Sequence, residues 1–234
     1  MIIVIIVNLL ILCLFALKLQ CIPAGFKSFE NINEYGFKFS NVHGNVISKW
    51  VKDFCSKRGN EYYIEVPKSF FNDPVVINTI NILYSSNHID DAMKIIMDIS
   101  TPDQFTKATY RSLEREIEDL YNLFHSKYIL TWDGMFSIKL KLKTCVFGNC
   151  PRIYCNGQKL LPVGLDDDVR KSSVKCFCPK CQDIYHPYPV IFRKIDGAAF
   201  GTTFPHLLML QFPELKVNTA SKKYTTKVFG FKIQ

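Results

Sequence analysis

The stretch of sequence that decides the fold reads Cys150-Pro-Arg-Ile-Tyr-Cys155 and, after a spacer of 22 residues, Cys178-Pro-Lys-Cys181. Each cysteine pair is close enough to sit on one tight turn, and the spacer can bring the two turns together. Four thiolates at about 2.3 Å from one zinc ion form a closed tetrahedral site with no position left for water. The spacing therefore predicts a structural zinc site rather than a catalytic one, with Cys150, Cys155, Cys178 and Cys181 as its ligands.

Disulfides or buried free thiols are the alternatives, because cysteine is among the most buried residue types. Cys176 complicates the ligand set, since strand alternation would place it on the same face as Cys178. We prefer Cys178 because it forms the C-x2-C pair with Cys181. Cys145 is likewise an additional cysteine close to a predicted ligand, Cys150. Three further cysteines show no spacing pattern with a partner: Cys13, Cys21 and Cys55.

Further motifs surround the cysteine pairs. They are Trp50-Val-Lys-Asp-Phe-Cys-Ser-Lys-Arg-Gly-Asn-Glu61, His125-Ser-Lys-Tyr-Ile-Leu-Thr131, Leu161-Pro-Val-Gly-Leu165, Asp196-Gly-Ala-Ala-Phe-Gly-Thr-Thr-Phe-Pro-His206 and Phe229-Gly-Phe-Lys-Ile233. Together with the cysteine pairs, these motifs resemble the regulatory beta subunit family of protein kinase casein kinase II, over roughly residues 46–234.

The resemblance implies an α+β fold in which an all-helical lobe at residues 45–142 precedes a zinc-ribbon β domain at 143–212. It further implies that the ribbon forms a homodimer and that the C-terminal tail, residues 213–234, docks the catalytic subunit. We expect a hydrophobic N-terminal segment at 1–22 and a linker at 23–44, where no apolar period is visible.

Apolar periodicity supports the helical lobe. Ile47, Trp50, Val51 and Phe54 define one helix face, and Arg58-Gly59-Asn60 supplies a glycine suited to a left-handed cap. Asn72-Asp73-Pro74 is a typical helix start. Two more helical faces lie at residues 89–97 and 113–124, and a last helix begins at residues 203–205. We expect an extended segment at residues 61–66. Short strands are predicted at residues 153–154, 159–161, 173–177 and 184–185.

The resemblance also assigns residues to two interfaces. The dimer interface would contain Pro151, Ile153, Tyr154 and Val163, apolar residues that a small ribbon cannot bury alone. The catalytic subunit would be bound by Phe229, Phe231 and Ile233, with Phe229 replacing a tyrosine of the family. If the tail is extended, Phe229 and Phe231 share one face.

The sequence departs from the family where the family carries a run of acidic residues linked to inhibition and polyamine sensing. Residues 99–107 hold a single carboxylate, Asp103, so polyamine stimulation should be weak. The N-terminal serine cluster that the family's own kinase phosphorylates is absent. Ser28 and Ser40 lack the downstream acidic residues that such a kinase wants, so feedback phosphorylation is not expected. The carboxylates of the next helix are expected on a solvated face, paired with Arg111 and Arg115: Glu114, Glu116, Glu118 and Asp119.

The N-terminal residues 1–17 are apolar except for Asn8. This is shorter than the roughly 20 residues of a spanning helix and longer than a signal-peptide core of about 7–15. If the segment is a membrane anchor, the positive charge on its C-terminal flank, beginning at Lys18, would leave the body of the protein in the cytosol. A signal peptide or a gene-model artefact are the other interpretations, while the nine cysteines favour a reducing compartment and the resemblance favours cytoplasm and nucleus.

The sequence shows neither a nucleophile paired with a base nor a phosphate-binding glycine loop, so we do not expect the chain itself to be a kinase. By resemblance, it would bind two catalytic alpha subunits and alter their stability and substrate choice. The alternative is a zinc-ribbon protein that binds nucleic acid or acts as a scaffold, which the formal charge of +8 permits. Residues 150–181 interleave few basic and aromatic side chains, so nucleic acid is not an expected partner.

Overall fold

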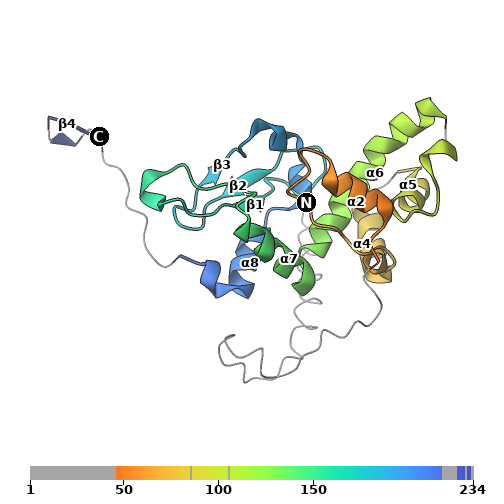
Figure 1. The fold of residues 1–234 in the computed structure, drawn as a ribbon, viewed down its shortest axis with the longest axis horizontal. Helices are drawn as coiled ribbons and strands as arrows, with labels where there is room; N and C mark the ends of the chain where they lie inside the picture. Colours follow the sequence, from red (N-terminus) through yellow and green to blue (C-terminus); the bar gives the residue numbers. More distant parts are fainter. Residues whose placement is uncertain (1–45, 85, 105, 218–225, 230, 233–234) are drawn as a thin grey trace, which may run out of the picture. The chain divides into compact units, whose positions relative to one another are not determined.

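The computed structural model describes residues 46–84, 86–104, 106–217, 226–229 and 231–232. Within these residues the chain forms seven α-helices, several short 3-10 turns and two small antiparallel sheets (Figure 1). This confirms the predicted mixture of helices and a small sheet. The apolar segment 1–22, the linker 23–44 and Ile233 lie outside the described residues. None of the described helices is both long and apolar enough to cross a membrane.

Six helices precede the three-stranded sheet. They are α2 (Lys49–Ser56), α3 (Lys68–Phe71), α4 (Pro74–Leu83), α5 (Ile89–Ile96), α6 (Lys107–Tyr128) and α7 (Trp132–Lys143). The 3-10 turn η2 (Pro102–Gln104) lies between α5 and α6. The predicted start of α4 is confirmed, because the Asp73 carboxylate accepts hydrogen bonds from the backbone N–H groups of Val75 and Val76, and Pro74 occupies the first turn.

The N-terminus of α2 is capped twice. Ser48 Oγ accepts from Val51 N, and the Asp98 carboxylate accepts from Lys49 N at 2.7 Å and from Trp50 N at 3.0 Å. Burial opposes ionisation of Asp98, yet these hydrogen bonds and Lys68 at 3.2 Å hold its pKa below the ordinary value. The end of α5 thereby satisfies backbone donors that α2 cannot satisfy itself.

The C-terminus of α2 differs from the prediction. The helix ends at Ser56 with an extended Lys57, and Gly59 (φ +95°) sits in the turn that follows instead of capping the helix. The capping backbone N–H is that of Lys57, which donates to Phe54 O at 3.2 Å, and the side-chain amide of Asn60 donates to the same oxygen at 2.9 Å.

Helix α6 is the centre of the helical region. Its predicted apolar face is buried: Leu113, Ile117, Leu120, Tyr121 and Phe124. Its carboxylates do not all lie on a solvated face, contrary to the prediction. Asp119 is buried and pairs with Arg170, which comes from the loop between the first two strands of the sheet, with Nε to Oδ1 at 3.0 Å. Glu116 accepts a hydrogen bond from Ser86.

Helix α7 was missing from the sequence prediction. Met135, Ile138 and Leu142 are buried at helical spacing, and this spacing is the signal that would have revealed it. Gly134 weakens the pattern, but the fold requires a glycine here because a Cβ would lie 2.1 Å from the carbonyl oxygen of Tyr128. The close approach of two helix ends therefore explains a residue that disfavours helix on its own.

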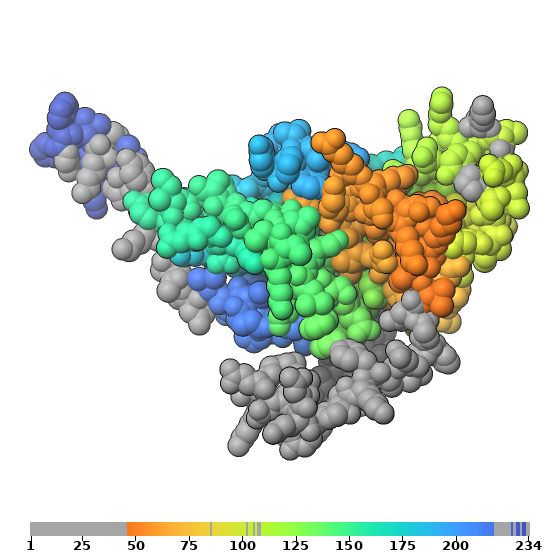
Figure 2. Space-filling view, viewed as in Figure 1, coloured from red at the N-terminus to blue at the C-terminus, as the bar shows by residue number. Residues whose placement is uncertain are grey.

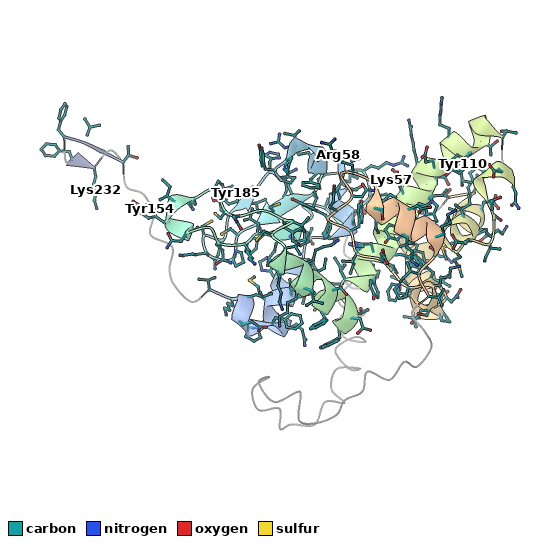
Figure 3. All side chains as sticks on the ribbon, viewed as in Figure 1. Lys57, Arg58, Tyr110, Tyr154, Tyr185 and Lys232 are labelled. Atoms are coloured by element: carbon teal, nitrogen blue, oxygen red, sulfur yellow. The ribbon has the colours of Figure 1, made fainter. Side chains whose placement is uncertain are left out.

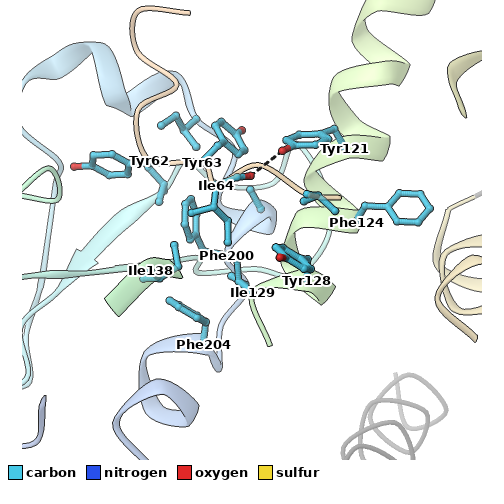
Figure 4. Packing of buried hydrophobic residues seen from close by; sticks show 14 of the residues in the cluster. Tyr62, Tyr63, Ile64, Tyr121, Phe124, Tyr128, Ile129, Ile138, Phe200 and Phe204 are labelled. Carbon is cyan, nitrogen blue, oxygen red and sulfur yellow. Dashed lines mark hydrogen bonds between the residues drawn. The ribbon is translucent and has the colours of Figure 1, made fainter. Parts of the chain in front are cut away.

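The extended segment at residues 61–66 runs through the core between these helices (Figure 4). Tyr121 donates its hydroxyl hydrogen to Ile64 O at 2.8 Å, the interaction dashed in the figure. Lys141 of α7 donates to Glu61 O at 2.8 Å and to Tyr63 O. Because these backbone groups have no strand partner, side chains satisfy them instead.

His125 joins three parts of the chain. Its Nε2 accepts from Ile64 N at 3.1 Å, and its Nδ1–H donates to Ala199 O at 2.7 Å. The residue is fully buried, and burial lowers the pKa of the imidazole to about 3. The ring must be neutral to accept at Nε2, so its geometry and its electrostatics agree.

The three-stranded sheet has the order β1-β2-β3 and is antiparallel throughout. Its strands are β1 (Leu161–Val163), β2 (Lys175–Phe177) and β3 (Ile184–Tyr185), with Leu161 opposite Phe177 and Cys176 opposite Tyr185. The predicted strand at 153–154 is wrong, because these residues begin the 3-10 turn η3 (Ile153–Cys155). The chain bends between Cys150 and Cys155, so residues 153–154 cannot be extended.

The C-terminal part holds η4 (Val190–Lys194), η5 (Gly197–Ala199), α8 (Phe204–Gln211) and η6 (Pro213–Leu215). Pro205 lies in the first turn of α8, as predicted. Beyond the undescribed residues 218–225, β4 (Lys227–Val228) pairs with β5 (Phe231–Lys232) in a hairpin. Most of the buried apolar residues, from Val51 to Phe212, form one cluster, so the helices and the sheet share a core.

Candidate metal centre

The four predicted zinc ligands lie together at one end of the three-stranded sheet. The sulfur atoms of Cys150, Cys155, Cys178 and Cys181 are all within 4.8 Å of one another. The Cys150 and Cys181 sulfurs are 3.8 Å apart, and those of Cys155 and Cys178 are 4.0 Å apart. A tetrahedron with zinc–sulfur bonds of about 2.3 Å has sulfur–sulfur edges of about 3.8 Å, so the donor set fits that metal.

The first cysteine pair is held by a turn closed at its base. Cys150 N donates to Gln158 O at 2.7 Å, and Leu160 N donates to Gly148 O at 3.1 Å. Between these bonds, η3 turns the chain so that Cys155 faces back toward Cys150. Asn156 and Gly157 then take left-handed conformations, with φ of 52° and 70°. An extended strand across residues 153–154 could not bring both sulfurs to one point.

The second pair is held by a tighter turn directly after β2. Gln182 N donates to Cys178 O at 2.8 Å, and Cys178 N donates to Asp183 O at 3.0 Å. Gln182 adopts a left-handed φ of 57°, which returns the chain into β3. Both turns are therefore fixed by backbone hydrogen bonds and not by the sulfur atoms alone.

Cys176, the competing candidate, points away from this cluster. Its sulfur lies 3.7 Å from the Tyr62 hydroxyl and 3.7 Å from Phe147 O, and burial raises its pKa to about 11. Cys176 belongs to β2, whereas Cys178 lies past the end of the strand, so strand alternation does not relate the two. Cys145 is exposed, and Cys55 lies 3.4 Å from the hydroxyl of Tyr121. Neither is in the cluster.

Burial makes two of the four thiols, those of Cys155 and Cys178, resist ionisation. It raises the pKa of Cys155 to about 11 and raises that of Cys178 further. Cys181 is the exception: burial raises its pKa, but hydrogen bonds from the Tyr185 hydroxyl at 3.3 Å and from neighbouring groups lower it to about 7. A divalent cation among the sulfurs would reverse this penalty and hold all four as thiolates.

The residues predicted for a dimer interface fall into two groups. Pro151 is exposed, and Ile153 and Tyr154 on η3 are 87% and 41% exposed (Figure 2, green segment; Tyr154 labelled in Figure 3). Val163 is only 5% exposed, so the premise that the ribbon cannot bury it alone is wrong. Its strand β1 packs against β2 and α8, and that packing covers it.

Sequence reasoning missed other exposed apolar residues of the ribbon region. They are Leu165, Ile184, Tyr188 and Val190. Such residues are isolated in the sequence and follow no period, so only the folded chain shows that they are exposed.

The C-terminal hairpin presents two exposed aromatic rings. Phe229 is 96% exposed and Phe231 is 78% exposed. They do not follow the extended alternation that was expected, because Phe229 lies in the hairpin turn with a left-handed φ of 49° and Phe231 lies on β5. A two-residue connection requires positive φ at its turn, and this requirement overrides strand alternation.

The fold and the site together define a class of protein in which a helical region is joined to a small sheet that carries a cluster of four cysteines able to hold a metal ion. Comparison with known proteins makes the assignment specific. The family model for the casein kinase II regulatory subunit matches residues 49–232. The chain therefore belongs to the casein kinase II regulatory subunit family.

Individual relatives agree with the family model. A putative casein kinase II subunit beta-4 of Arabidopsis thaliana is 41% identical over 188 residues, covering 80% of this chain and 66% of the relative. Casein kinase II subunit beta of Schizosaccharomyces pombe is 40% identical over 184 residues, covering 79% of this chain and 78% of the relative. The corresponding Dictyostelium discoideum protein is 39% identical, covering 79% and 68%.

Proposed function

We propose that this chain is a non-catalytic regulatory subunit of casein kinase II, dimerising through a zinc ribbon and binding two catalytic alpha subunits. In this proposal the chain alters the stability and substrate choice of the kinase. The observation that carries the proposal is the pair of exposed apolar features, one on η3 beside the cysteine cluster and one on the C-terminal hairpin. The proposed domain layout is a helical lobe at 45–142, a ribbon at 143–212 and a docking tail at 213–234.

Zinc is the metal proposed for the cluster. Four thiolates at tetrahedral spacing suit Zn²⁺ better than Mg²⁺ or Ca²⁺, which prefer oxygen ligands. The strands β1, β2 and β3 have three, three and two residues, too few to be stable without a further link. Bound zinc would supply that link, holding the two cysteine turns in place while Tyr185 orients Cys181.

The ribbon of one chain is proposed to pair with that of a second chain around η3. Ile153 and Tyr154 are apolar side chains next to a rigid turn, as an isologous interface between two copies requires. Val163 is not part of this surface, because its own chain buries it. Ile153→Asp should give a monomer that retains zinc, while Leu210→Asp, a change at another strongly exposed apolar site, on α8, should leave the dimer intact. Sedimentation measures the oligomeric state of both variants, and metal analysis measures their zinc content. A dimeric Ile153→Asp protein would contradict this interface.

The hairpin is proposed to be the contact for the catalytic subunit, with Phe229, Phe231 and Ile233 as its apolar residues. A two-stranded hairpin is marginal alone in water, so the exposed rings gain most by entering a groove on a partner. Truncating such an aromatic anchor typically costs about 2 kcal/mol, or roughly thirtyfold in affinity.

The experiment that tests the function is calorimetric titration of the casein kinase II catalytic subunit into the zinc-loaded chain. Phe231→Ala should bind roughly thirtyfold more weakly, while Lys232→Ala, a change at the next position of the same strand, should bind like the parent. Zinc content and dimer should be unchanged in both variants. Equal affinity of Phe231→Ala and the parent would refute hairpin docking, and no binding by the parent would refute the regulatory function.

The proposed compartment is the cytoplasm and nucleus, where thiols remain reduced. The seven described cysteines are all free thiols, which supports a reducing environment. Membrane attachment would depend on residues 1–22, which lie outside the described part of the chain. Nucleic acid is not proposed as a partner.

A further inference from the structure

An open hollow of about 720 Å³ lies against α6, and none of the four clustered cysteines lines it. The linker between α4 and α5 forms one wall, with Tyr84, Ser86 and His88. Arg111 and Arg115 of α6 form another, and Arg170 joins them from the loop before β2. Three guanidinium groups from two distant parts of the sequence therefore surround one cavity.

The charges that line the hollow do not balance. Glu116 is the one carboxylate among the described lining residues, and it already accepts a hydrogen bond from Ser86. Arg170 is held by Asp119, which lies just outside the lining. Neither Arg111 nor Arg115 forms a salt bridge with any described residue. Two exposed guanidinium groups thus remain available to a ligand.

The alternative is that these arginines simply form a solvated helix face. Arg111 and Arg115 are four residues apart on α6, and like charges at this spacing destabilise a helix. Arg115 has a carboxylate four residues further on, but this is Asp119, which is engaged by Arg170. Carboxylates also follow three residues after each arginine, Glu114 after Arg111 and Glu118 after Arg115, but among the described residues neither forms a salt bridge with its arginine. The arrangement therefore concentrates positive charge where local pairing could have relieved it, and a bound anion would relieve it.

We propose that this hollow, lined by Arg111, Arg115 and Arg170, binds a phosphate dianion. A guanidinium fork matches two phosphate oxygens at once, and two free forks match a dianion in both charge and geometry. The Ser112 hydroxyl and the His88 ring lie on the same lining and can add hydrogen bonds. The volume falls in the range of about 300–1,000 Å³ found for ligand sites, so there is room for the group that carries the phosphate.

That phosphate has two possible sources, a free small phosphate compound or a phosphorylated side chain of another protein. Calorimetry on the full chain in chloride buffer of fixed ionic strength separates them, with inorganic phosphate, a phosphoserine peptide and the same peptide unphosphorylated as probes. Tighter binding of the phosphopeptide than of phosphate, with no binding of the unphosphorylated peptide, identifies a phosphorylated side chain. Phosphate binding at least as tight as the phosphopeptide identifies a free compound.

The double variant Arg111→Gln, Arg115→Gln should weaken binding of the preferred probe at least tenfold, since each charge-assisted hydrogen bond contributes strongly. Arg111→Lys should weaken it less, because the charge remains while the fork is lost. Arg193→Gln removes an exposed arginine outside the hollow and should bind like the parent. Failure of the parent to bind either phosphate probe, or unchanged binding by the correctly folded double variant, overturns the proposal.

Discussion

Acidification should destabilise the protein through one residue, His125. Its pKa is near 6.5 in an unfolded chain and about 3 in the folded one, because burial disfavours the charged ring. The unfolded state therefore binds a proton first as the pH falls. The contribution of the neutral ring to the free energy of unfolding is fully present above about pH 6.5. It is lost progressively as the pH falls from there to about pH 3. Between pH 7.5 and pH 5.0 the loss from this group is about 2 kcal/mol.

The structure gives a variant that isolates this effect. His125→Gln cannot reproduce both the bond from Ile64 N and the bond to Ala199 O, so it should lower the unfolding free energy at pH 7.5 by about 1–3 kcal/mol. It should also lose about 2 kcal/mol less than the parent between pH 7.5 and 5.0, because the titrating ring is gone. His186→Gln, at an exposed histidine, should keep the pH dependence of the parent.

Urea denaturation at a fixed protein concentration measures these differences, since association would otherwise change the apparent stability. Carboxylates and the cysteine cluster also titrate on acidification, but they are common to the parent and both variants and cancel in the comparison. If the parent and His125→Gln lose the same free energy between pH 7.5 and 5.0, the neutral buried ring is not the cause.

Three further predictions concern the metal, regulation and the buried ion pair. Cys178→Ser should lose zinc and dimer together, because metal binding and folding are linked in such sites; a stable dimer by sedimentation would contradict this. The reconstituted holoenzyme should respond weakly to spermine in a kinase assay, because Asp103 is the only carboxylate in residues 99–107. Strong stimulation by spermine would contradict this prediction. Arg170→Ala should lower the unfolding free energy by about 1–3 kcal/mol in thermal or urea denaturation, because it leaves the buried Asp119 without its partner. Arg193→Ala should change it by less than about 0.5 kcal/mol, and equal losses would show that the pair is not stabilising.

The sequence predicted the parts of the fold that local chemistry determines. The start of α4 follows from Asp73 and Pro74, and the buried face of α6 follows from apolar spacing, because both signals lie within one or two helical turns. The four cysteines converge because their spacing permits little else. Helix α7 escaped notice although Met135, Ile138 and Leu142 have helical spacing, since Gly134 argues against a helix and its reason is a contact with Tyr128.

Errors arose where a distant partner decides the outcome. Asp119 was expected to pair along its own helix, yet its partner Arg170 is 51 residues away, and no local pattern shows that pairing. Gly59 was expected to cap α2, but Lys57 N and the side chain of Asn60 both donate to the carbonyl of Phe54, and Gly59 lies in the turn that follows. Val163 was expected at the surface of the ribbon, whereas α8 covers its strand. In each case the residue type was interpreted correctly and the neighbour was not visible in the sequence.

The unpredicted pairing of Asp119 also explains why the hollow beside α6 is positively charged. A loop residue with a left-handed backbone, Arg170 at φ 63°, reaches α6 and takes the carboxylate that Arg115 would otherwise use. The ion pair thus joins the loop before β2 to the helical region and, by the same contact, leaves Arg115 free. Stability and charge distribution are coupled here through one carboxylate. A change at Asp119 should therefore alter both the unfolding free energy and any anion binding, whereas changes at Arg111 should alter anion binding alone.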